Sequence, residues 1–92
     1  MAQQLKPLEE HDRDQNSPET GLVATLEAYL RNNGHVESAA TTLGIHRHTL
    51  RNRLARIREL TNCDLDSADS RTELWLAIKA REMLAIGEAS PD

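Results

Sequence analysis

The residues most able to do chemistry are arginines gathered in one short segment. Residues 46–58 read HRHTLRNRLARIR and contain five arginines and no acidic residue, although the whole chain carries a formal net charge of −4. Evenly mixed charges would serve solubility equally well, so this segregation indicates a local surface for an anionic partner. Guanidinium groups pair with phosphate oxygens and with guanine, so double-stranded DNA is the partner we expect.

The other reactive residue types form no catalytic or metal-binding pattern. Cys63 is the only cysteine, which excludes an internal disulfide and a zinc site built from cysteines. His46 and His48 are two positions apart, so they would not share a helix face, and no carboxylate joins them at ligand spacing. No nucleophile, base and orienting group stand at a usable spacing, and no glycine-rich phosphate loop is present. We therefore expect no enzyme activity, no catalytic residue, no cofactor and no metal.

The residues before and within the arginine segment have the spacing of a helix-turn-helix unit. Such a unit needs a small residue where its helices meet, a glycine at the turn, a plug after the turn, and inward anchors on the second helix. The sequence meets these needs, in order, with Ala40, Gly44, Ile45, Leu50 and Leu54. The pattern predicts a short helix over 36–43 and a longer one over about 46–60.

Once the leucines of residues 46–60 point inward, the helical repeat assigns the remaining positions to the solvent side. The N-terminal part of such a helix normally enters the major groove, where arginine can read guanine and asparagine can read adenine. The predicted base-reading residues are Arg47, His48, Arg51 and Asn52. The residues expected to contact phosphates are Thr49, Arg53, Arg56 and Arg58. A small Ala55 would let the helix approach the floor of the groove.

The rest of the chain predicts an all-α domain of four helices. Leucine, isoleucine, valine and alanine must fill the core, because there is no phenylalanine and only one tryptophan and one tyrosine. Residues 1–17 are polar, acidic and without sustained periodicity, and we expect a flexible tail or linker there. Ser17-Pro18-Glu19 is a typical helix start, so the predicted helix-turn-helix DNA-binding domain spans 18–88.

The last predicted helix, over about 68–86, is apolar on more than one face. Trp75, Leu76 and Met83 belong to a surface wider than one core requires. We expect this extra surface to contact a second copy or an upstream sensor domain. No apolar run approaches the length of a membrane span, so we expect a cytoplasmic protein without a membrane partner. No small-molecule site is expected in this stretch of chain.

Three blocks of the sequence resemble the C-terminal helix-turn-helix domain of PucR-type bacterial transcriptional regulators, which include the sugar-diacid regulators. The blocks are LEAYL (26–30), AATTLGIHRHTLRNRLARI (39–57) and ELTNCDLDSADSRTEL (59–74). The resemblance covers about residues 20–80, and the TLxxRLxxI pattern is also similar to Fis-type domains. It implies the DNA-binding end of a longer regulator whose upstream part senses a metabolite.

The chain departs from the pattern of the family at three positions. The family usually has asparagine where His35 and His48 stand, and commonly an aromatic residue where Asn52 stands. Histidine is expected to cap the second helix less well than asparagine. His48 and Asn52 lie on the predicted reading face, so those departures imply a changed base preference.

A helix-turn-helix can also serve as a protein-interaction or dimerisation module that binds no DNA. This alternative predicts binding to a protein partner and no shift of a duplex in a gel.

Overall fold

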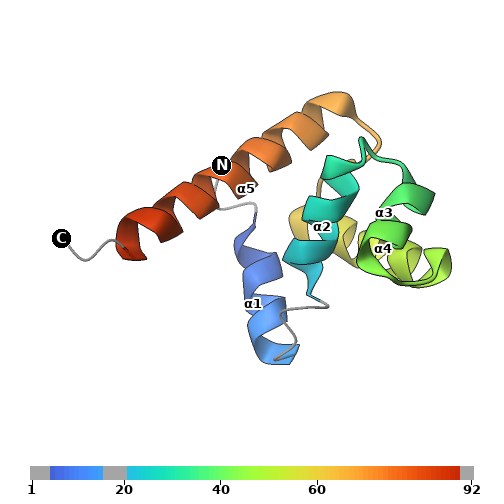
Figure 1. Ribbon diagram of the computed structural model, residues 1–92, viewed down its shortest axis with the longest axis horizontal. Helices are drawn as coiled ribbons and strands as arrows, with labels where there is room; N and C mark the ends of the chain where they lie inside the picture. Colours follow the sequence, from blue (N-terminus) through green and yellow to red (C-terminus); the bar gives the residue numbers. More distant parts are fainter. Residues whose placement is uncertain (1–4, 16–20, 90–92) are drawn as a thin grey trace.

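The computed structural model describes residues 5–15 and 21–89, and this part of the chain is built from helices (Figure 1). The helices are α1 (Lys6–Gln15), α2 (Leu22–Arg31), α3 (Val36–Leu43), α4 (Arg47–Thr61) and α5 (Ala68–Ala89). No strand occurs in the described ranges, so the predicted all-α class is confirmed. The bounds of α3 and α4 agree closely with prediction.

Helix α2 lies at the centre of the molecule and packs against each of the other four helices. Its apolar residues recur every three or four positions, so they cover a wide face, and Leu26 in the middle of that face is completely buried. Leu50 and Leu54 of α4, Leu74 and other core residues surround it. The helix begins at Leu22, later than predicted, and the expected start at Ser17-Pro18-Glu19 lies outside the described residues.

The N-terminal segment contains a fifth helix where a flexible tail was predicted. Leu5 and Leu8 are 1% and 0% exposed, and they join the core through contacts of α1 with α2 and α4. The sequence did not predict this helix because two leucines three residues apart are too short a pattern to indicate one. A surface supplied by the rest of the domain stabilises such a helix once the chain folds. The predicted boundary between residues 17 and 18 lies outside the described residues.

Polar contacts fasten α1 to its neighbours. Gly21 precedes α2 without a side chain that could cap it, and Asp12 of α1 performs this role instead. Its carboxylate accepts hydrogen bonds from the backbone N–H groups of Leu22 (2.6 Å) and Val23 (3.1 Å). A Cβ atom at position 21 would lie 2.6 Å from this carboxyl group, so the close approach requires glycine. Glu9 also accepts a hydrogen bond from Arg81 of α5.

The loop between α4 and α5 is held to the core by one buried residue. Leu65 is 0% exposed, and its carbonyl oxygen accepts hydrogen bonds from the Tyr29 hydroxyl (3.4 Å) and the Arg71 guanidinium (3.1 Å). Asn62 ends α4 in the left-handed conformation, with φ of 55°. These contacts fix where α5 begins relative to α2 and α4.

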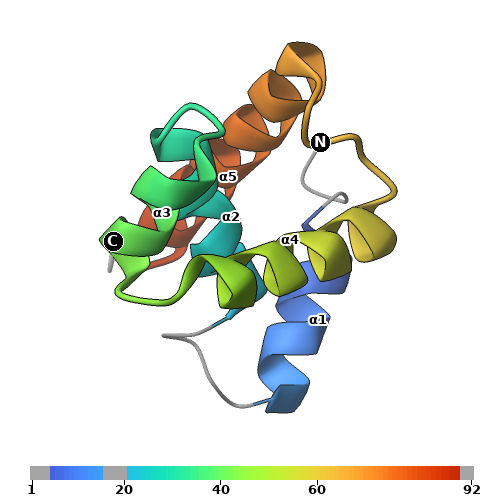
Figure 2. The same cartoon turned by 90° about the vertical axis from the view of Figure 1, so that its right-hand side faces the viewer.

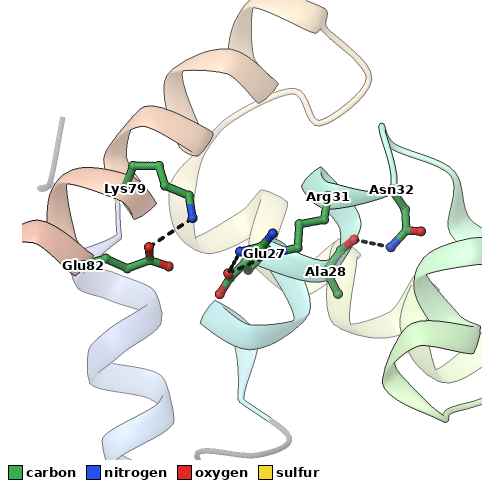
Figure 3. A network of polar contacts seen from close by, with 6 residues as sticks. All are labelled: Glu27, Ala28, Arg31, Asn32, Lys79 and Glu82. Atoms are coloured by element: carbon green, nitrogen blue, oxygen red, sulfur yellow. Dashed lines mark hydrogen bonds and ion pairs between the residues drawn. The ribbon is translucent and has the colours of Figure 1, made fainter.

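Helix α5 runs along one side of α2 and extends well beyond it (Figure 1). Trp75 lies at their seam with two cations near its ring, Arg31 at 5.3 Å and Lys79 at 4.5 Å from the ring centroid. Figure 3 shows the acidic partners of both cations, with Arg31 bonded to Glu27 and Lys79 bonded to Glu82. Cations over an indole face are attracted by its quadrupole, so this cluster ties α5 to α2.

The cap supplied by Asp12 leads to a test of whether α1 belongs to the folded domain. Asp12→Ala removes both acceptors from the first turn of α2, and we expect a loss of about 1–2 kcal/mol of unfolding free energy. Urea denaturation followed by circular dichroism measures it. Glu10→Ala, an exposed change on the same helix, is the control and should cost less than about 0.5 kcal/mol. Equal stability of the two variants would contradict a structural role for α1.

Candidate nucleic-acid interface

Helices α3 and α4 form the helix-turn-helix unit, and its turn has the predicted geometry. Gly44 adopts a left-handed conformation, with φ of 70° and ψ of 34°. The N–H groups of Gly44 and Ile45 donate to the carbonyl oxygens of Thr41 (3.1 Å) and Ala40 (3.0 Å), which closes the end of α3. Ala40 is buried and Ile45 packs against the core, so both residues have the predicted surroundings.

A side-chain contact joins α2 to this unit. Asn32, just after α2, donates through Nδ2 to the carbonyl oxygen of Ala28 (2.7 Å, Figure 3) and to Oγ1 of Thr42 in α3 (3.2 Å). One amide group therefore closes the end of α2 and holds α3 beside it. This limits how far the helix-turn-helix unit can rotate on its scaffold.

The inward face of α4 consists of a row of aliphatic side chains. Leu50, Leu54 and Ile57 are 0%, 1% and 0% exposed, which confirms the predicted orientation. These positions follow the helical repeat, so the side chains between them must point away from the core. Figure 2 shows α4 lying across the side of the molecule that faces the viewer.

Most of the predicted DNA-contacting side chains are on the outward face. Arg53 and Arg58 are half-buried, since they flank the buried row. The exposed ones are Arg47, His48, Thr49, Arg51, Asn52 and Arg56. Ala55 is also exposed, which leaves the middle of this face free of a bulky side chain. The structure thus brings all eight predicted residues to one helix, six of them fully at its surface.

Two histidines shape the start of α4. His46 is the N-cap, and its Nδ1 accepts a hydrogen bond from the backbone N–H of His48 at 3.1 Å. The two rings stack with centroids 5.0 Å apart. This contact was not predicted, because His46 precedes the helix and helical spacing does not apply to it. Within the described residues, no group of three or more His, Cys, Asp and Glu could hold a metal ion.

Several arginines of α4 are paired with acids that the sequence did not single out. The pairs are Arg47 with Glu37 (3.2 Å), Arg56 with Glu59 (3.3 Å) and Arg58 with Asp66 (3.7 Å). Only the Arg56 pair has a sequence signal, the spacing of three residues on one helix. In the described part of the chain, Arg51 and Arg53 make no ion pair. Exposed pairs of this kind are weak in water, so a phosphate can displace the acid.

Comparison with known proteins identifies the family of this domain. Residues 22–80 match the PucR C-terminal helix-turn-helix domain. The chain belongs to this family. The matched residues include α2, α3 and α4 and the first part of α5, whereas α1 precedes them. No solved structure gave a significant match.

Several of the similar curated proteins are named as regulators. The chain is 37% identical over 79 residues to the DNA-binding transcriptional activator AdeR of Bacillus subtilis. The aligned residues make up 86% of this chain and 18% of that protein. It is 44% identical over 61 residues to the transcriptional activator PmfR of Paenarthrobacter nicotinovorans. Here the aligned residues make up 66% of this chain and 13% of that protein. The carbohydrate diacid regulator of Escherichia coli is 43% identical over 61 residues, 66% of this chain and 16% of that protein. The chain thus spans less than a fifth of each of these relatives.

None of the helices in the described ranges is long and apolar enough to span a membrane.

The turn before α4 allows a test of what positions the outward face. A Cβ atom at Gly44 would meet no atom within 4 Å, so only its backbone conformation disfavours a side chain. We expect Gly44→Ala to cost about 1 kcal/mol of unfolding free energy, measured by urea denaturation. Gly44→Asn should cost less, because asparagine adopts the left-handed conformation more readily. If alanine were tolerated as well as asparagine, steric strain at this turn would not be what demands glycine.

Proposed function

We propose that this domain binds duplex DNA sequence-specifically as the DNA-binding part of a bacterial transcriptional regulator, with α4 in the major groove. The observation that carries the proposal is the outward face of α4, where arginines are exposed because the aliphatic row opposite them is buried. Family membership and the regulators among its relatives support it. Bacterial DNA is cytoplasmic, so this function would be performed in the cytoplasm.

The first two turns of α4 carry the proposed base contacts. Arg47 and Arg51 can each donate two parallel hydrogen bonds to O6 and N7 of guanine, and Asn52 can pair with adenine in the same bidentate manner. His48, oriented by its stacking on His46, is the fourth proposed reader. Ala55 presents only a methyl group, so the helix can approach the base edges closely.

The phosphate contacts are proposed to flank this reading edge. Arg53 and Arg58 lie between the buried row and the exposed face, where side chains can reach sideways to the strands that border a groove. Thr49 and Arg56 complete this set. Contacts to phosphates fix the register of the protein without reading sequence, and they release counterions. Affinity should therefore depend strongly on salt.

A protein-interaction module remains the second candidate function. Three of the five arginines of α4 pair with acids of the same chain, so acidic side chains of a partner protein could occupy the same positions. The two functions differ in their response to DNA. Binding that discriminates single base pairs belongs to the first function alone.

The outer face of α5 suggests a second partner. Leu76, Met83 and Leu84 are 48%, 72% and 62% exposed, and helical spacing aligns Leu76, Ala80 and Met83 in one stripe. In an antiparallel pair of α5 helices, Met83 of each copy would oppose Ala80 of the other. A large residue would then meet a small one in both of these pairings, so we propose a homodimer through this stripe. An upstream sensor domain in the same place is the competing occupant.

The proposed DNA contacts can be tested with the duplex that the protein selects from a random pool. We expect Arg51→Ala to lower the preference for the selected base pair by about 1–3 kcal/mol. Arg58→Ala should weaken binding to all duplexes similarly and reduce the slope of log K against log salt by about 1. Fluorescence anisotropy at several salt concentrations measures both quantities. Arg31→Ala, which removes a cation from the seam of α2 and α5, is the control and should change neither.

Two results would contradict these assignments. Binding to duplex DNA that does not weaken with salt would exclude the phosphate contacts. Loss of sequence preference in Arg58→Ala, with uniform weakening in Arg51→Ala, would mean that the two edges of α4 are assigned in reverse.

The proposed dimer can be tested by sedimentation velocity over a range of protein concentrations. The wild-type chain should sediment faster as concentration rises, as expected for a monomer–dimer equilibrium. Met83→Glu buries a charge in the stripe and should raise the dissociation constant at least about tenfold. Ala55→Glu adds the same negative charge on the exposed face of α4 and should leave self-association intact. A wild-type monomer at every concentration would contradict the homodimer.

A further inference from the structure

Glu37 joins the two helices of the helix-turn-helix unit through a contact to a proposed reader. It lies in the first turn of α3, and its Oε1 accepts a hydrogen bond from Nη1 of Arg47 at 3.2 Å. Arg47 is the first residue of α4, so the pair bridges the turn from the outside. Both side chains are more than half exposed, which leaves the rest of the guanidinium open to a ligand.

The contact to Glu37 leaves other hydrogen-bond donors of the Arg47 guanidinium available. An arginine has five N–H donors in one plane, and a bidentate contact to guanine uses two parallel ones. With Nη1 directed at Glu37, the edge formed by Nε and Nη2 still offers such a pair. We propose that Glu37 is a positioning residue that fixes Arg47 for reading a base and so determines specificity. This inference rests on the proposed function.

The charge of Glu37 adds a second effect on the same arginine. A phosphate that approached Nη1 of Arg47 would come close to the Glu37 carboxylate, and like charges repel at this range. A base edge carries no net charge and meets no such repulsion. Glu37 therefore disfavours the use of Arg47 as a phosphate contact and preserves it for a base. Arg51, the other arginine reader, has no acidic partner within the described residues.

Glu59 provides a matched comparison on the other side of α4. It pairs with Arg56, three residues before it on the same helix, at 3.3 Å. Arg56 is a proposed phosphate contact, so Glu59 competes with the DNA backbone whatever the base sequence. Removing Glu59 should strengthen binding to all duplexes alike, whereas removing Glu37 should also relax discrimination.

The test measures dissociation constants of the full chain for three kinds of 20-base-pair duplex. These are the selected site, its single-base-pair variants and a random sequence. For Glu37→Ala we expect tighter binding to the random duplex and up to about fivefold weaker discrimination at one base pair, the one that Arg47→Ala also affects, because the pair is exposed. For Glu59→Ala we expect tighter binding to every duplex with unchanged ratios. Combining Glu37→Ala with Arg47→Ala should reduce discrimination no further than Arg47→Ala alone.

The outcomes separate this inference from the proposed function. If the wild-type chain selects no sequence, both the proposed function and the inference about Glu37 are refuted. If the wild type is selective and Glu37→Ala changes all affinities by one common factor, as Glu59→Ala does, the role of Glu37 alone is refuted. Unfolding free energies of the three single variants check that each remains folded.

Discussion

The burial of one face of α4 is the constraint on which the rest of this domain depends. Leu50, Leu54 and Ile57 are each removed almost completely from water, and burying a side chain of this size contributes about 1.5–3 kcal/mol. Rotating α4 by half a turn would expose all three and bury arginines in their place, at a much larger cost. The outward direction of the guanidinium groups is therefore a consequence of core packing.

That packing depends in turn on a scaffold drawn from distant parts of the chain. α2 provides the central surface, but its first turn is capped by Asp12 of α1, because Gly21 has no side chain to do so. Its last turn is joined to α3 through Asn32, and the Tyr29 hydroxyl bonds to the backbone of the loop before α5. The central helix is thus held at both ends by groups outside it, which restricts the position of α3 and α4.

The sequence predicted the helix-turn-helix unit well because its determinants are local. Gly44 is required by one backbone conformation, and the leucines of α4 follow a repeat that one helix suffices to display. The helix α1 and the buried Leu65 were missed for the opposite reason. Each presents too few apolar residues to form a pattern, and each is buried only because a surface from elsewhere in the chain covers it. Their placement depends on tertiary contacts that no short window contains.

The difference between local sequence patterns and tertiary contacts also explains the electrostatics of α4. The sequence shows a basic helix in a chain of net charge −4, but it does not show which acids lie near which arginines. Folding brings Glu37 from α3 and Asp66 from the loop before α5 to within 4 Å of arginines on α4. A paired arginine that meets a phosphate, as proposed for Arg56 and Arg58, must first give up its acid, so part of the Coulombic gain of binding would be cancelled. This reduces affinity for every sequence, whereas a bond to a base edge adds affinity at one sequence only. Acids placed beside basic side chains therefore favour selective binding over tight binding.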